Sequence, residues 1–186
     1  MSDTTITILD AALGVFGANG FHGTTISLIA EASGVSRPTV YARYKNKEEV
    51  FRAVYQRVFD LALADVCAVL ARDRPLDELL SGALLAYFGR LYEVVLSFER
   101  ADELIAEQDR LAADIMLDAS TRVRAAFVGA LERHGNTPRS GATVDELVDI
   151  LTLAPRAFKD PAGGAEVYHA RLRLLANLVA RDLCSE

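Results

Sequence analysis

Residues 24–51, TTISLIAEASGVSRPTVYARYKNKEEVF, carry start and stop signals for two short helices in close succession. Either of the two leading threonines can cap the first helix, and Ser33-Gly34 ends it with a glycine that tolerates the left-handed conformation. Ser36 can cap a second helix, with Pro38 in a first turn where a missing N–H loses no hydrogen bond. Two helices joined by such a turn form a helix-turn-helix, which we expect at about residues 25–44.

The second helix of this motif presents a surface without acids. No Asp or Glu lies between Ser33 and Asn46, although the whole chain carries 26 acidic and 20 basic residues and a net charge of −6. That net charge argues against nucleic-acid binding through the whole surface, so any such site must be local. With Val40 and Tyr44 facing the interior, the outward side chains suit the major groove of B-DNA. We expect base contacts from Arg37, Pro38, Thr39 and Ala42, and phosphate contacts from Thr25, Ser27, Tyr41, Arg43 and Lys47.

Apolar residues at spacings of three and four predict helices in the rest of the chain, and no strand signal appears. The predicted helices span about residues 4–18, 46–71, 76–97, 102–107, 109–134, 143–155 and 165–183. The fold class is therefore all-α. We expect a three-helix DNA-binding domain over residues 1–52 and a helical bundle for ligand binding and dimerisation over residues 53–186.

The last two predicted helices are apolar over a wider arc than one buried face requires. A second copy of the chain would cover the extra arc, although two central helices of a monomeric core would show the same pattern. The predicted dimer interface consists of Leu147, Leu151, Leu172, Leu175, Leu178 and Val179.

Aromatic and thioether side chains in the second domain suggest a small-molecule pocket, although helical spacing also explains them as core. The predicted pocket consists of Tyr87, Phe88, Tyr92, Phe98, Met116, Phe127 and Phe158.

Other classes of site lack support in the sequence. We find no nucleophile–base pair, metal-ligand spacing or glycine-rich phosphate loop, so we expect neither an enzyme nor a bound metal or cofactor. Cys67 and Cys184 are expected to be buried small apolar residues in a reducing compartment. The N-terminus lacks the regions of a signal peptide, and no uninterrupted apolar run reaches the roughly 18 residues of a membrane span. We therefore expect a cytoplasmic protein without a membrane partner.

The N-terminal third resembles the DNA-binding domain of the tetracycline-repressor (TetR) family over about residues 4–60. Glycine is frequent in the family where Pro38 stands, so Pro38 is expected to shift the sequence preference. The resemblance implies a homodimer built from the last two long helices, a small-molecule effector held in the C-terminal domain, and release of a palindromic operator when the effector binds. Most members are repressors. The residues that carry the resemblance are Phe16, Gly20-Phe21, Thr24-Thr25, Ile29-Ala30, Gly34-Val35-Ser36, Thr39, Tyr41, Tyr44 and Lys47-Glu48-Glu49.

Two alternatives belong to other classes of protein. A helical protein of the same fold could bind small molecules or partners without reading DNA, and it would show acids or bulky apolar residues on the outward face of the second motif helix. A helical enzyme would need an acid–base set in the pocket. The sequence shows neither feature.

Overall fold

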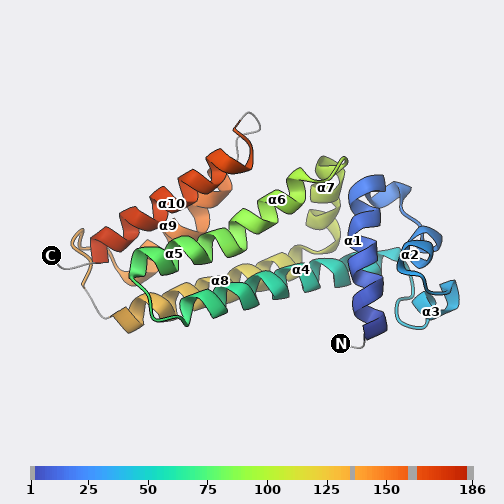
Figure 1. The fold of residues 1–186 in the computed structure, drawn as a ribbon, viewed down its shortest axis with the longest axis horizontal. Helices are drawn as coiled ribbons and strands as arrows, with labels where there is room; N and C mark the ends of the chain where they lie inside the picture. Colours follow the sequence, from blue (N-terminus) through green and yellow to red (C-terminus); the bar gives the residue numbers. More distant parts are fainter. Residues whose placement is uncertain (1–2, 135–136, 159–162, 184–186) are drawn as a thin grey trace. The chain divides into compact units, whose positions relative to one another are not determined.

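The structure, a computed structural model, describes residues 3–134, 137–158 and 163–183. Every regular element within these ranges is a helix (Figure 1), which confirms the predicted all-α class. The elements are α1 (Asp3–Gly23), α2 (Ile26–Ser33), α3 (Arg37–Tyr41), α4 (Lys47–Leu70), α5 (Leu76–Leu84), the π-helix η1 (Leu85–Gly89), α6 (Arg90–Leu96), α7 (Ala101–Leu111), α8 (Ala113–His134), α9 (Val144–Ala157) and α10 (Gly164–Leu183).

Several helix ends differ from the predicted ones. Helical geometry breaks at Gly20, with φ 68° and ψ 179°, close to the predicted end of the first helix, and α1 then resumes to Gly23. The predicted helix over residues 76–97 is one run of α5, η1 and α6. Ala112, with φ −136°, leaves helical geometry, so α7 extends to Leu111 and α8 begins at Ala113 instead of residue 109.

The described residues group into two compact units. The N-terminal unit comprises Met1–Asp60 with Val95–Leu117, and the C-terminal unit comprises Leu61–Val94 with Asp118–Glu186. α7 therefore belongs with the N-terminal helices, which the order of elements along the chain does not suggest. The functional boundary between residues 52 and 53 stays a prediction.

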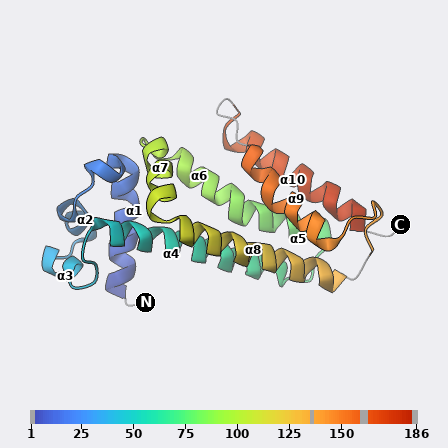
Figure 2. The ribbon, with the colours of Figure 1, turned by 180° about the vertical axis from the view of Figure 1, so that it is seen from behind.

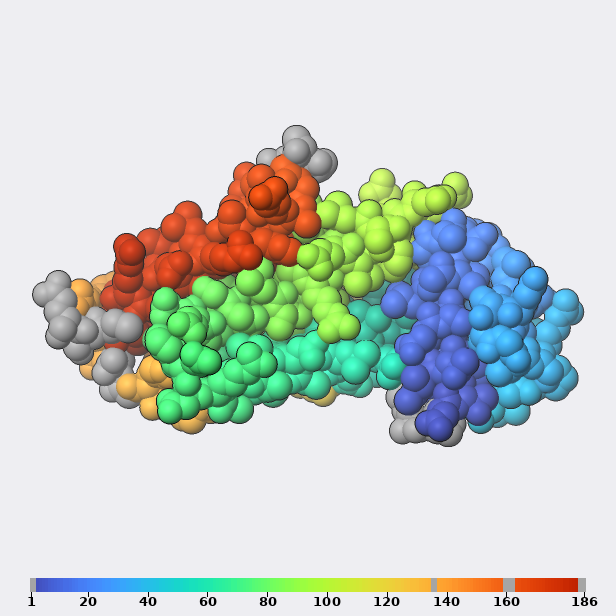
Figure 3. Space-filling model, viewed as in Figure 1, coloured from blue at the N-terminus to red at the C-terminus, as the bar shows by residue number. Residues whose placement is uncertain are grey.

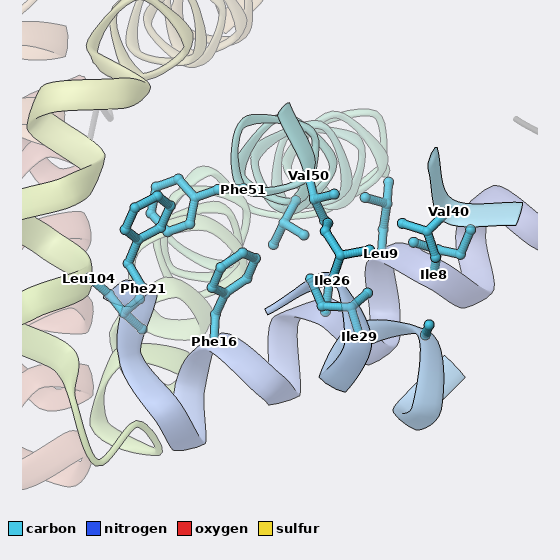
Figure 4. Packing of buried hydrophobic residues seen from close by; sticks show 13 residues of the cluster. Ile8, Leu9, Phe16, Phe21, Ile26, Ile29, Val40, Val50, Phe51 and Leu104 are labelled. Carbon is cyan, nitrogen blue, oxygen red and sulfur yellow. The ribbon is translucent and has the colours of Figure 1, made fainter. Parts of the chain in front are cut away.

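Apolar side chains from α1 to α4 and from α7 form the core of the N-terminal unit (Figure 4). The rings of Phe16 and Phe51 meet edge to face with their centroids 5.1 Å apart, and Phe21 meets Phe51 in the same way at 5.1 Å. Leu104 of α7 is buried in this cluster. Burial of aromatic and branched side chains is the largest favourable contribution to folding, so this cluster holds α2 and α3 in place.

In the C-terminal unit, α10 packs along α5 and η1 (Figure 2). Tyr168 is buried and packs against Tyr92 with the rings tilted by 39° and their centroids 4.3 Å apart. Its hydroxyl donates a hydrogen bond to the carbonyl of Pro155 at 3.1 Å.

Within Leu76–Leu96, a window of 18 residues has a mean hydropathy of 1.4, so this run is long and apolar enough to cross a membrane. Arg90 and Glu93 interrupt it, which agrees with the expectation that no uninterrupted apolar run reaches this length. Its elements α5 and η1 pack on α10, and a core helix meets the same two criteria.

Candidate nucleic-acid interface

Local hydrogen bonds define both ends of the turn between α2 and α3. The hydroxyl oxygen of Thr25 accepts a hydrogen bond from the Leu28 N–H at 3.2 Å and caps α2. Gly34 ends α2 with φ 68° and ψ 17°, a conformation that strains residues with a Cβ atom. The hydroxyl oxygen of Ser36 then accepts from the Thr39 N–H at 3.2 Å and caps α3. The predicted caps of the helix-turn-helix are confirmed.

The outer face of α3 is exposed, and Figure 3 shows the residues of α3 and the following loop, in light blue, at the surface. Val40 is fully buried and Tyr44 packs partly against the core, as expected. Arg37, Pro38 and Ala42 are exposed, and 55% of Tyr41 is exposed. The regular helix α3 ends at Tyr41, before the predicted end, although a hydrogen bond from the Tyr44 N–H to the Val40 carbonyl at 3.0 Å still closes the following turn.

Two side chains on α3 differ in their freedom to move. Among the described residues, no hydrogen bond or ion pair engages the guanidinium of Arg37. Thr39 is half-buried, and its hydroxyl lies 2.8 Å from that of Ser36. A free guanidinium can donate both hydrogen bonds that a guanine edge accepts.

Arg43, just after α3, is oriented by the protein. Its Nε donates to the hydroxyl of Thr5 at 3.1 Å, and its Nη1 lies 3.4 Å from the carbonyl of Thr39. The guanidinium thus sits beside the first turn of α1 while remaining exposed. Thr25 and Ser27, in the first turn of α2, are exposed and half-buried respectively.

Lys47 has a different role from the predicted phosphate contact. Its ammonium donates to the carbonyls of Phe21, Thr24 and His22 at 2.8, 3.1 and 3.3 Å, and lies 4.4 Å from the ring centroid of Phe21. An ammonium has three protons, and three carbonyls occupy them. Lys47 therefore fastens the end of α1 to the start of α4. Sequence reasoning missed this role because the carbonyls lie more than twenty residues away.

Residues 8–54 match the family model described as bacterial regulatory proteins, tetR family. Over this segment, the chain is similar to the DNA-binding part of the tetR family. Two curated relatives support this: RutR from Escherichia coli K12 is 32% identical over 114 residues, which are 61% of this chain and 51% of RutR. The transcriptional activator FasR from Mycolicibacterium smegmatis is 29% identical over 119 residues, which are 60% of this chain and 54% of FasR.

The tetR-type fold extends over nearly the whole chain. A transcriptional regulator from Rhodococcus sp. Rha1 aligns with a TM-score of 0.67 over 97% of this chain and 99% of its own, at 19% identity. This likeness shows a shared helical fold. The chain spans about half the length of the curated relatives it matches.

Contacts that sequence reasoning missed fasten α7 to the helix-turn-helix region. The carboxylate of Glu103 accepts a hydrogen bond from the His22 N–H at 2.8 Å, which lowers the pKa of Glu103. The carboxylate of Glu107, a largely buried residue, lies 2.6 Å from Arg110 and 3.3 Å from the imidazole of His22. No spacing signal in the sequence links α7 to the end of α1.

Arg52 of α4 holds the junction between α7 and α8. Its guanidinium binds the Asp114 carboxylate at 2.8 and 2.7 Å and also donates to the carbonyl of Leu111. The hydrogen bond from Arg52 lowers the pKa of Asp114 to about 2. A bidentate pair at the start of α8 is a geometry that arginine provides and lysine does not.

The predicted pocket residues are divided between the two units. Phe98 and Met116 belong to the N-terminal unit and the other five to the C-terminal unit. Tyr87, Tyr92 and Phe127 are buried core residues, and burial raises the pKa of Tyr87 to about 12. Phe88 and Phe158 are half-buried. The burial of Tyr87, Tyr92 and Phe127 agrees with the other interpretation of the pattern, as core, and the pocket itself stays a prediction.

The predicted interface residues lie mostly inside the subunit. Leu147, Leu151, Leu172, Leu175 and Val179 are at most 7% exposed, whereas Leu178 is 57% exposed. The outer half of the wide apolar arc carries other residues of α9 and α10. They are Ile150, Leu153, Val167 and Leu174, which are 38 to 60% exposed. We call these four and Leu178 the outer apolar face.

Proposed function

We propose that this protein is a tetR-family transcriptional regulator that binds a palindromic operator as a homodimer. The acid-free, exposed face of α3, with its unengaged Arg37, is the observation that carries the proposal. The major groove accommodates a helix of this size, and Arg37 supplies the donor pair that distinguishes guanine from the other bases. Pro38 and Ala42 offer apolar contacts for thymine methyl groups beside it.

Contacts to the DNA backbone would fix the position of α3 in the groove. Arg43 is exposed and already oriented by Thr5, so its guanidinium needs little ordering to meet a phosphate. The free N–H groups of the first turn of α2, beside Thr25 and Ser27, suit a second phosphate. Tyr41 can donate to a third through its exposed hydroxyl. Lys47 is not part of this proposed set because its protons bind carbonyls.

A homodimer would place two α3 helices on one operator. The outer apolar face supports this because contiguous apolar surface on two adjacent helices favours association with another apolar surface. A symmetric dimer requires the two reading helices to lie about 34–36 Å apart, or a multiple of that spacing, along B-DNA. The operator would then be a palindrome with that spacing between its halves.

Regulation is proposed to operate through a small molecule bound in the C-terminal unit that releases the operator. An effector shifts the protein from the DNA-binding state only through its different affinities for the two states. We propose repression as the outcome of DNA binding, as in most members of the family. The relative FasR is named an activator. A reporter gene placed behind the operator, with and without the protein, distinguishes repression from activation.

Selection of bound fragments from random duplex DNA, followed by fluorescence anisotropy on the selected site, tests the DNA-binding proposal. We expect a palindromic site, and Arg37→Gln should weaken binding to it by about 1–3 kcal/mol, or roughly fivefold to more than a hundredfold. The variant should also lose discrimination at one base pair in each half-site. Arg139→Gln, which makes the same charge change in the C-terminal unit, is the control.

The outcomes separate this function from its alternative. A folded wild-type protein that binds no duplex at low ionic strength would contradict the proposal and support a binding protein that does not read DNA. If the wild type and Arg37→Gln bind every selected sequence with equal affinity, Arg37 does not recognise a base.

A further inference from the structure

A cavity of about 490 Å³ lies in the C-terminal unit where α4 and α8 end and α5 begins. These three helix ends lie together in both ribbon views (Figures 1 and 2). The volume falls within the range of natural small-molecule sites, about 300–1,000 Å³. The lining residues are Cys67, Leu70, Ala71, Arg72, Asp73, Arg74, Leu79, Ala126, Ala130, Arg133 and His134.

The cavity combines an apolar floor with a basic rim. Leu70, Leu79 and Ala130 are buried and contribute apolar surface from all three helices. The rim carries Arg72, Arg74 and Arg133 against the single acid Asp73, so the ionised lining residues sum to two positive charges. The chain as a whole has a net charge of −6, so this local excess is opposite in sign to the rest of the protein.

The three arginines are engaged to different extents. Arg133 donates from Nη2 to the carbonyl of Leu70 at 3.3 Å and so binds the end of α8 to the end of α4. Arg72 and Arg74 are exposed, and no hydrogen bond or ion pair within the described part of the chain engages their guanidinium groups. Two unpaired guanidinium groups can bind a carboxylate through charge-assisted hydrogen bonds. The apolar lining beside them can then contact the apolar part of the same ligand.

We propose that this cavity binds a small amphipathic carboxylate, with the acid group at Arg72 and Arg74 and the apolar body against Leu70 and Leu79. The inference rests on the regulatory part of the proposed function and deepens it, because it names a ligand class and a place for it in the C-terminal unit. None of the cavity's residues belongs to the predicted DNA contacts or to the predicted aromatic pocket. It holds whether or not the chain binds DNA.

The reactivity of Cys67 provides a way to measure ligand binding in the cavity. Its side chain lies in the cavity wall and is exposed, whereas the sequence analysis expected it to be buried. The chain has two cysteines, and Cys184 lies outside the described residues. In the full-length Cys184→Ser protein, Cys67 is the only thiol, so its rate of alkylation reports on access to the cavity. Iodoacetamide is the suitable reagent because it is neutral and its approach does not depend on the arginines.

The experiment measures the alkylation rate of Cys67 with octanoate, with octan-1-ol and with inorganic phosphate. We expect octanoate to slow alkylation at least about fivefold at saturation, because a bound ligand shields the wall. Octan-1-ol, which lacks the charge, and phosphate, which lacks the apolar body, should protect much less. Calorimetry with octanoate on the same protein provides the stoichiometry, which we expect to be one per chain.

A matched pair of variants tests the role of the arginines. In Arg72→Gln/Arg74→Gln, the octanoate concentration for half-maximal protection should rise about tenfold, since charge-assisted hydrogen bonds are lost. Arg133 is kept in both variants because it supports the end of α4. Arg37→Gln/Arg43→Gln makes the same charge change in the N-terminal unit. In this variant, octanoate should protect Cys67 at the same concentration as in the wild type. Circular dichroism checks that both variants are folded.

Three outcomes would overturn the proposal. Octanoate that leaves the alkylation rate unchanged would show that the cavity binds no such ligand. Equal protection by octan-1-ol, or equal protection in the Arg72→Gln/Arg74→Gln variant, would exclude recognition of the carboxylate. Equal protection by phosphate would exclude a contribution from the apolar floor. None of these results depends on DNA binding, so they leave the proposed DNA-binding function unaffected.

Discussion

At the scale of single residues, the role of Lys47 depends on its surroundings in the fold. A lysine in the first turn of a helix after a helix-turn-helix is a reasonable phosphate ligand by sequence. In the fold its ammonium caps the carbonyls at the end of α1 and lies over the ring of Phe21. We therefore expect its charge to stabilise the position of the motif instead of contacting DNA.

Replacing Lys47 should affect stability before it affects DNA binding. Lys47→Met keeps an apolar stem over Phe21 and leaves three carbonyls without a donor, and we expect a loss of about 1–3 kcal/mol in the free energy of unfolding. Urea denaturation followed by circular dichroism measures it. Lys45→Met is the control, since the Lys45 side chain is 89% exposed and its ion pair with Glu49 spans 3.9 Å, so its effect should stay within about 0.5 kcal/mol.

The salt dependence of DNA binding by Lys47→Met would show whether Lys47 contacts a phosphate after all. If Lys47 contacts a phosphate, Lys47→Met would lower the slope of log affinity against log salt by about one unit and leave stability unchanged. Those two results together would show that Lys47 contacts a DNA phosphate.

At the scale of elements, the kink in α1 and the position of α7 depend on each other. Gly20 adopts φ 68°, and a Cβ atom there would overlap the carboxylate of Glu103 on α7. The same carboxylate accepts the His22 N–H just beyond the kink. The kink thus exposes a backbone donor that α7 uses.

A methyl group at position 20 should disturb this arrangement. Gly20→Ala should lower the free energy of unfolding by about 1–2 kcal/mol for the positive φ alone, with a further loss from the overlap with Glu103. Gly14→Ala is the matched control, because nothing lies within 4 Å of its Cβ position and alanine favours a helix by up to about 1 kcal/mol. Thermal unfolding should move the two variants in opposite directions. A neutral Gly20→Ala would show that α1 can straighten.

The pair between α4 and the start of α8 should make stability depend on pH. Arg52 lowers the pKa of Asp114 to about 2, whereas an unfolded aspartate titrates near about 3.9. The stabilisation is therefore complete above the unfolded pKa and is lost as the pH falls towards 2. Asp114→Asn should unfold at lower urea concentration than the wild type at pH 6, and the difference should narrow as the pH falls below about 4.

A suitable control for this pH effect is Asp73→Asn, an exposed loop acid without an ion pair in the described part of the chain. It should show no comparable narrowing. A gap between wild type and Asp114→Asn that stays constant down to pH 3 would contradict the role assigned to Arg52.

At the scale of the whole molecule, dimerisation should depend on the outer apolar face and not on the buried leucines beside it. Leu174 and Leu178 of α10 are 60% and 57% exposed, so replacing them leaves the core of the subunit intact. Leu174→Arg/Leu178→Arg should convert a dimer to a monomer, with a dimer dissociation constant at least about a hundredfold higher. Sedimentation equilibrium measures this constant.

The control for the dimer is Leu61→Arg, which introduces an arginine at a leucine of α4 that is 43% exposed. It should remain dimeric. A wild-type protein that is monomeric at micromolar concentration, or a double variant that stays dimeric, would contradict the proposed assembly.

Local features of the sequence were sufficient for much of the fold. Thr25, Gly34 and Ser36 act through hydrogen bonds and backbone angles within four residues, so their roles could be predicted without knowing what surrounds them. The same holds for α9, where Thr143 and Glu146 form a capping box at the predicted helix start. The acid-free surface of α3 could also be predicted, because a short helix with one buried side leaves the rest of its residues outside.

Other features were decided by the tertiary structure, because they depend on contacts between residues far apart in the chain. Periodicity located the apolar residues of α9 and α10, but only packing separated the buried Leu147 and Leu172 from the exposed Ile150 and Leu174. The sequence by itself determined the helices and their caps, since hydrogen bonds and helical spacing act over a few residues. The role of Lys47, the attachment of α7 to α1 and the arginine-rimmed cavity arose only when distant helices came together, since charge and burial depend on neighbours in space.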